Sequence, residues 1–181
     1  MKKLLFIAIA IFGFSLVSFG QSTSTQNATA SAKLMKALVL TKTSDMNFGT
    51  ITTTNATGSV TLPAAAAPSR GVTGGATLFG GTVAAATFTV AGDINTEITV
   101  QIPTAPIEIK LGGTSNVATE KMTVGTFVSD PVTTAGSGLT TLDVAGTSTI
   151  YVGATLSIGA GQVPGLYSNP TGGFDVTVHY N

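Results

Sequence analysis

The chain has 181 residues, no cysteine and a formal net charge of zero, and only 9% of its residues are charged, against about a quarter in an ordinary soluble domain. These numbers exclude a disulfide scaffold and a cysteine-based metal site, and they leave no basic surface that could neutralise the phosphates of a nucleic acid. Hydrophobic residues make up 43% of the chain, which argues against general disorder.

The first twenty residues have the layout of a secretory signal peptide. Lys2 and Lys3 precede the uncharged apolar run Leu4–Val17, and Gly20 places a small residue directly before a cleavage point. The run is shorter than the about 20 apolar residues that a membrane-spanning helix requires. We therefore expect a cleaved signal peptide over residues 1–20 and an exported mature chain with no membrane span.

The next twelve residues, 21–32, consist only of Ser, Thr, Gln, Asn and Ala. Such a segment carries too little apolar surface to fold on its own. We expect a flexible polar arm, or an extended arm that becomes ordered through contact with something else. Residues 33–181 are then long enough to form one domain with a core of its own.

Beyond residue 32 the β-branched residues Thr, Val and Ile dominate, and short runs alternate apolar and polar side chains with a period of two, which is typical of half-buried strands. The clearest runs cover residues 86–90, 98–102, 107–111, 150–158 and 174–180. The ambiguous stretch Leu34–Leu40 is also predicted to be a strand, because it leads into further threonines.

Glycine pairs separate many of these runs, and we interpret the glycines of Gly71–Gly81 as turn residues. No window after residue 20 shows a convincing helical face. The short spacing between runs favours antiparallel strands over alternating strands and helices. The sequence therefore predicts an all-β fold, an antiparallel β-sandwich in a single domain.

The side chains suited to catalysis or metal binding are few. His179, the only histidine, lies on the polar side of the last alternating run, and a nucleophilic site would need a serine and an acid beside it. The eight acidic residues are scattered singly, and nothing in the sequence brings Asp143 and Asp175 together across a cleft or clusters acids as calcium ligands. We predict no catalytic, cofactor-binding or metal-binding residues, and no enzymatic activity.

The order and spacing of four stretches resemble an exported bacterial family, domain of unknown function 4402 (DUF4402). The stretches are Asp45–Ile51, Gly74–Thr82 with Ala86–Gly92, Gly146–Leu156 with Gly165–Tyr167, and Phe174–Tyr180. The resemblance covers about Lys33 to Asn181. That family has no established catalytic residues to carry over. Its pattern is similar to secreted domains of the spore-coat-U and fimbrial-subunit type, which implies an immunoglobulin-like sandwich.

The same resemblance implies partners. Chaperone–usher pilins end in an alternating strand with a penultimate aromatic residue, which Tyr180 matches, although Ser168 stands where such pilins tend to carry glycine. They also use an N-terminal arm with large alternating apolar residues, whereas residues 21–32 offer only Ala28, Ala30 and Ala32. The implied partners are the protein itself or related subunits, through strand addition, and a periplasmic chaperone.

Two functions remain open. The leading hypothesis is a non-catalytic exported surface protein, in the periplasm, at the cell surface or outside the cell, that acts as a structural or adhesive pilin-like subunit. A sandwich that lacks one strand exposes an unpaired edge and an apolar groove, which a neighbour's segment can fill. The alternative is a monomeric secreted binding module for a glycan or a surface protein. The aromatic candidates for its surface are Tyr151, Tyr167, Phe79 and Phe127, although core packing is expected for the two phenylalanines.

Overall fold

The computed structural model describes residues 22–131 and 136–181, so the predicted signal peptide lies outside the described residues. The chain divides into two units, residues 1–34 and residues 35–181. In the first unit, residues 22–34 contain neither helix nor strand, and every one of them is exposed.

The second unit is all-β, as predicted, and every strand pairing in its described residues is antiparallel. The strands are β1 (Val39–Ser44), β2 (Thr50–Leu62), β3 (Gly71–Gly80), β4 (Ala86–Ala91), β5 (Glu97–Gln101), β6 (Ile107–Leu111), β7 (Lys121–Asp130), β8 (Ser137–Thr141), β9 (Thr147–Ile158), β10 (Tyr167–Ser168) and β11 (Thr177–Tyr180). One short 3-10 turn, η1 (Ala118–Glu120), precedes β7.

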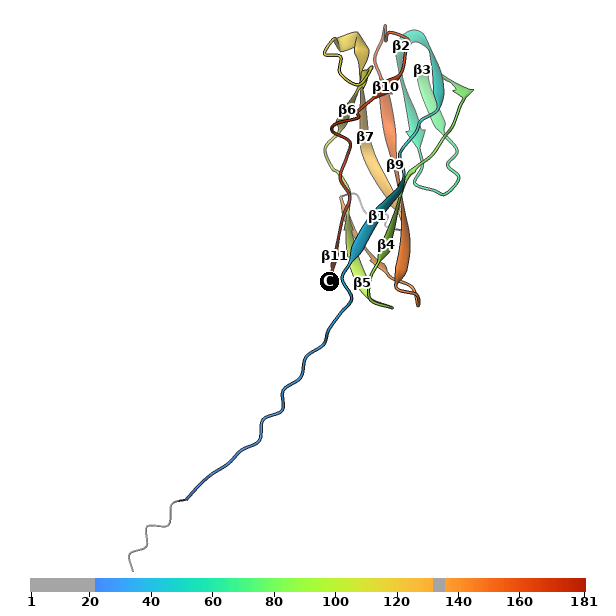
Figure 1. Cartoon of the computed structure of the whole chain (residues 1–181). Coiled ribbons are helices and arrows are strands. Elements are labelled where there is room, and N and C mark those ends of the chain that lie inside the picture. Colours follow the sequence, from blue (N-terminus) through green and yellow to red (C-terminus); the bar gives the residue numbers. More distant parts are fainter. Residues whose placement is uncertain (1–21, 132–135) are drawn as a thin grey trace, which may run out of the picture. The chain divides into compact units, whose positions relative to one another are not determined.

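Strand β9 organises the larger of the two sheets, because three other strands pair with it (Figure 1). Its first half, Thr147–Val152, pairs with β4, and its last part, Ala154–Ile158, pairs with β2 on the same edge. The opposite edge pairs with β7, which continues through β6 to β10. The sheet therefore branches on one side of β9, into β4 with β1 and into β2 with β3. A smaller sheet, in the order β11-β5-β8, forms the second layer of the sandwich.

The core lies between the two sheets and follows the period-2 pattern of the sequence. Along β9, the alternate residues from Ile150 onward are all buried: Ile150, Val152, Ala154, Leu156 and Ile158. Phe88 and Val90 of β4 and Ile98 and Val100 of β5 belong to the same cluster. Each large aliphatic side chain buried in this way contributes about 1.5–3 kcal/mol relative to its exposed state. The antiparallel sandwich predicted from alternation is thus confirmed.

Three predicted elements differ from the structure. Leu34–Leu40 is not a strand as a whole, because the strand starts at Val39, and the run 174–180 forms a strand only from Thr177. The interpretation of Gly71–Gly81 as turn glycines was wrong, because Gly71–Gly80 is β3. Two of these glycines, Gly74 and Gly75, are needed for close pairing with β2: a Cβ on Gly74, whose φ is +67°, would lie 2.4 Å from the carbonyl oxygen of Thr57.

Neighbouring residues of β9 provide a test of this layering. Ile150 is fully buried, whereas Thr149 is exposed on the outer face of the sheet. Replacing Ile150 by Ala should lower the free energy of unfolding by about 2–5 kcal/mol, because it removes buried methyl groups and leaves a cavity. Thr149→Ala, the matched control, should change it by about 0.5 kcal/mol or less. Urea unfolding measures both, and equal losses would contradict the assigned faces.

Candidate functional site

A groove of about 1410 Å³ lies in the second unit. Two chain segments form its walls: residues 42–53, which we call the first wall, and residues 162–175, the second wall. Its floor consists of apolar side chains from the main sheet. They are Ile107 and Ile109 of β6, Met122 and Val124 of β7, and Leu156 and Ile158 of β9. The groove is therefore a place where the inner face of the main sheet is not covered by the smaller sheet.

The first wall is hydrogen-bonded along one edge only. The end of β1 pairs with β4, Asn47 exchanges two backbone hydrogen bonds with Ala84 (2.8 and 3.0 Å), and Thr50–Thr53 pairs with β3. Within the described residues, no backbone pairing uses the opposite edge of this wall. A free strand edge of this kind presents N–H and C=O groups that can pair with another chain.

Arg70, the only arginine in the sequence, fixes the first wall to the end of β3. Its guanidinium donates to the carbonyl oxygens of Phe48, Thr50 (3.2 Å) and Gly80 (3.2 Å). Hydrogen bonds from a charged donor are stronger than those between neutral groups. The wall bends at Gly49, whose φ of +69° lies in the left-handed region, and Arg70 holds both sides of this bend.

Residues 167–169 of the second wall attach it to the main sheet. Tyr167–Ser168, strand β10, pairs with Leu111 and Lys110 of β6, and the side-chain amide of Asn169 donates to the carbonyl of Glu108 at 2.9 Å. Further along, residues 170–176 make no backbone pairing in the described structure, and pairing resumes only where Thr177 meets Gln101 of β5. The second wall therefore also has an unpaired stretch.

Tyr167 anchors the second wall through its hydroxyl group. The oxygen lies 2.6 Å from the carbonyl oxygen of Val163, 3.2 Å from that of Thr119 and 3.1 Å from Oε1 of Gln162. Burial raises the pKa of Tyr167, and the negative charge of Glu120 raises it further, against a smaller lowering by the hydrogen bond to Val163. The hydroxyl therefore stays protonated at neutral pH, and its single proton can be donated to one of these three oxygens at a time.

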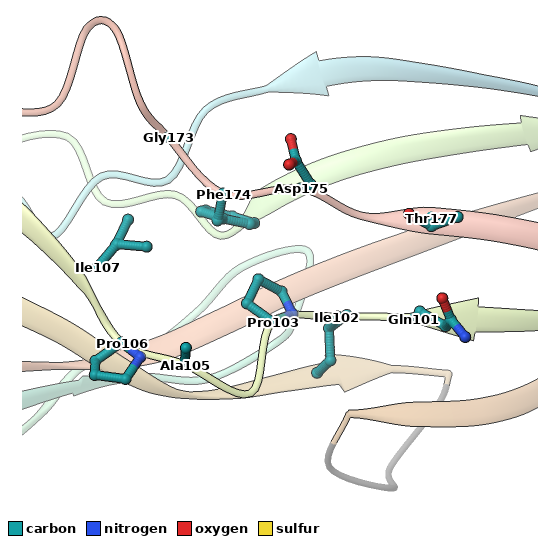
Figure 2. Close-up of a pocket in the computed structure, with 10 residues that line it drawn as sticks. All are labelled: Gln101, Ile102, Pro103, Ala105, Pro106, Ile107, Gly173, Phe174, Asp175 and Thr177. Atoms are coloured by element: carbon teal, nitrogen blue, oxygen red, sulfur yellow. The ribbon is translucent and has the colours of Figure 1, made fainter.

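Phe174 lines both the groove and a smaller, open depression of about 370 Å³ (Figure 2). It projects from the second wall, and its ring centroid lies 5.0 Å from that of Phe127 and 6.5 Å from that of Phe88. Figure 2 shows it among Pro103 and Ile107, with Asp175 next to it on the same segment. Gly173, Asp175 and Ile107 line both hollows as well, so the two hollows adjoin at this part of the second wall.

Tyr180 joins the two chain segments that continue from the walls. Its hydroxyl donates to the carbonyl of Lys36 (3.0 Å), just before β1, and accepts from the backbone N–H of Asp93 (2.7 Å). A side chain on Gly92 would collide with this hydroxyl, because a Cβ there would lie 2.4 Å from the oxygen. The penultimate aromatic residue thus ties β11 to the start of β1.

The charged residues of the groove are Lys42, Asp45 and Asp175, so its lining carries a net charge of −1. Lys42 and Asp45 form an ion pair at 2.5 Å, but both side chains are more than half exposed. Such a surface pair contributes only about 0–1 kcal/mol. The groove is therefore mainly apolar, with a slightly acidic rim.

The residues considered for catalysis from the sequence lie apart. His179 is exposed on β11 opposite Thr99. Asp143 lies in the turn before β9, where its carboxylate accepts from the N–H groups of Ala145 (2.9 Å) and Thr147 (2.8 Å); chiefly the Thr147 bond lowers its pKa. Asp175 lies on the groove rim, and no contact in the described structure joins it to Asp143. Within the described ranges, no three His, Asp or Glu side chains lie close enough together to hold a metal ion. No helix in these ranges is long and apolar enough to cross a membrane.

The four aromatic candidates have different surroundings. Phe127 is buried, as expected, and Tyr167 stands in the second wall, while Tyr151 is half-buried on the outer face of β9. The expectation of core packing was wrong for Phe79, which is 77% exposed. Its neighbour Leu78 takes the inward position of β3, and successive strand residues point to opposite faces.

The model of a known protein family matches most of the chain that forms this fold. The family described as "Domain of unknown function (DUF4402)" matches residues 38–180. The chain belongs to this family. The matched range of the DUF4402 domain includes both walls and the whole floor of the groove. No curated protein and no solved structure matches the chain significantly.

The role assigned to Arg70 is testable. Arg70→Met should lower the free energy of unfolding by about 1–3 kcal/mol, because it leaves carbonyl groups without their donor. It should also speed amide exchange of the first wall. Lys42→Met, which removes an exposed cation of the same wall, is the control and should cost about 1 kcal/mol or less. Denaturant unfolding with hydrogen-exchange mass spectrometry measures both effects, and similar behaviour of the two variants would contradict the role of Arg70.

Proposed function

We propose that this DUF4402 protein is a non-catalytic, exported surface subunit, structural or adhesive, whose groove accepts an extended peptide segment by strand addition. The observation that carries the proposal is the combination in one place of an apolar floor and two walls, each with an unpaired backbone stretch. An extended segment that enters such a groove gains main-chain hydrogen bonds at its edges and places alternate side chains on the floor.

The sequence features fit this proposal. Residues 1–20 have the layout of a signal peptide, which would bring the chain to a compartment where surface fibres or coats assemble. An apolar groove and two free edges are an aggregation hazard before assembly. A periplasmic chaperone that covers the groove temporarily is therefore part of the proposal, as is an immunoglobulin-like classification of the sandwich.

A monomeric binding module for a glycan or a surface protein is the alternative. Its support is Phe79, an aromatic side chain that is 77% exposed at the end of β3. The two proposals differ in what they require of a ligand. Strand addition depends on the backbone N–H groups of a peptide, whereas stacking on an exposed ring does not.

The experiment therefore compares two synthetic peptides. One has eight alternating threonine and valine residues, and the other has the same sequence with N-methyl groups on alternate residues, which removes half of its backbone donors. The exported, processed chain should bind the first peptide more tightly by about 100-fold, because about three hydrogen bonds of about 1 kcal/mol each are lost with the second. Isothermal titration calorimetry measures both affinities.

Two protein variants locate the binding site. Ile109→Glu places a charge on the groove floor and should abolish binding of the unmethylated peptide, whereas Thr61→Glu, on the outer face of β2, should not. Circular dichroism confirms that both variants are folded. Equal binding of the two peptides, or binding that survives Ile109→Glu, would refute strand addition in the groove.

A further inference from the structure

Strand β3 has one edge that no other strand pairs with. Its backbone pairs with β2 on one side, and within the described residues no backbone hydrogen bond uses its opposite side. With ten residues, β3 is longer than the other described strands that pair on one side only, which are β1, β8, β10 and β11 and have two to six residues. It therefore presents the longest strand edge that is open to another chain in the described part of the fold.

This edge lacks the charged residues and prolines that protect many exposed strand edges. Both oppose pairing with a further strand, and Gly71–Gly80 contains neither. The cation next to it, Arg70, is half-buried and donates to carbonyl groups of the first wall and of Gly80, so its guanidinium is already bound. By comparison, the free edge of β1 carries Lys42. Two copies of β3 can therefore approach each other without charge repulsion.

The order of side chains along β3 is symmetric about Gly75. Residues at equal distances on its two sides belong to the same class, first small, then threonine, then aliphatic. The matching pairs are Gly74 and Ala76, Thr73 and Thr77, and Val72 and Leu78. Two identical strands that pair antiparallel about a two-fold axis place each residue opposite its counterpart across the axis. A second β3 therefore offers a matching side chain at each of these positions.

We infer that β3 is a contact between two copies of this protein, which pair antiparallel along this edge with Gly75 at the two-fold axis. The main sheets of the two subunits then form one continuous sheet. This contact goes beyond the proposed function and does not depend on it. Residues Thr50–Thr53 of β2 pair with β3 on one side and border the groove as part of the first wall, whose opposite edge is unpaired. The groove therefore stays open in the dimer.

The faces of the two strands agree in this register. Val72 lies opposite the buried Val60 of β2, and Leu78 packs against the core, so both belong to the inner face of the sheet. Thr73 and Thr77 alternate with them and are exposed on the outer face. A two-fold axis perpendicular to the sheet keeps the inner faces of both copies on the same side. Val72 of one copy therefore meets Leu78 of the other, and threonine meets threonine.

The contact covers two apolar side chains of β3 that are exposed in the single chain. Val72 is 41% exposed and Phe79 is 77% exposed. In the inferred register, Phe79 lies opposite Gly71 of the second copy. Gly71 has open space beside it, because the one atom near a Cβ built there is Cβ of Thr61, at 3.9 Å. An aromatic ring that covers a glycine on the neighbouring strand stabilises strand pairing.

Disulfide trapping tests the partner and the register together, because the chain has no cysteine of its own. In the dimer, the Cα atoms of Thr73 in one copy and Thr77 in the other lie about 4.5–5.5 Å apart, which a disulfide can bridge. Under mild oxidation, exported, processed chains with Thr73→Cys mixed with chains with Thr77→Cys should give about tenfold more cross-linked dimer than either variant alone, since identical positions lie about 13 Å apart. Thr123→Cys mixed with Thr149→Cys, exposed on the outer face of the same sheet, is the control and should give only background.

Charges at the same two positions test the contact without a cross-link. A chain with Thr73→Lys and Thr77→Lys places like charges opposite each other twice, so its dimer dissociation constant should rise by about tenfold or more. Mixing it with a chain that carries Thr73→Glu and Thr77→Glu should restore the dimer as a heterodimer, which also shows that both variants are folded. Thr123→Lys with Thr149→Lys is the control and should leave dimerisation unchanged. Sedimentation equilibrium measures all of these dissociation constants.

The outcomes separate a second copy from other occupants. A chain that stays monomeric up to about 1 mM, a dimer indifferent to both charge variants, or cross-linking no better than the control would refute the inference. If the chain is monomeric and Thr73→Lys with Thr77→Lys abolishes binding of the threonine–valine peptide while Ile109→Glu does not, the edge accepts a foreign strand, which also refutes a second copy. Ile109→Glu should leave the β3 dimer intact, so failure of the groove and failure of this contact are distinct results.

Discussion

The smaller sheet of this protein has three strands and the main sheet eight, so it does not cover the whole apolar inner face of the main sheet. Ile107, Ile109 and Met122 lie where this cover is missing and are only half-buried. Apolar surface left in water is unfavourable in proportion to its area. The two walls reduce that area with their own side chains, Met46 and Phe174 among them, and what remains between them is the groove.

The walls cover Val124, Leu156 and Ile158 but leave Ile107, Ile109 and Met122 only half-buried, because each wall is bound to its own side of the sandwich. Arg70 holds the first wall to the end of β3, and Tyr167 holds the second wall to the segment around η1. The backbone N–H and C=O groups of the walls that have no partner within the subunit must bind water or another chain. The same contacts that stabilise the isolated subunit therefore preserve two free edges, which connects the packing of the fold to its proposed assembly.

Alternation in the sequence was sufficient to predict β4, β5, β6 and β9, because each buries one face against the core. It failed at β3, because the glycines that permit close pairing with β2 look like turn residues. Phe79 of this strand was therefore predicted to be buried, whereas it is exposed. The DUF4402 resemblance was confirmed over residues 38–180. The groove could not be predicted, because its walls are irregular segments whose positions depend on distant partners such as Arg70, which no local pattern reveals.

The most direct test of the open groove is hydrogen exchange of the exported, processed chain, measured by mass spectrometry at dilutions where it is monomeric and at concentrations where it assembles. We predict rapid exchange in residues 170–176 of the monomer and marked protection on assembly, while the centre of β9 is protected in both states. Protection of residues 170–176 already in the monomer, or no change in them on assembly, would contradict the account.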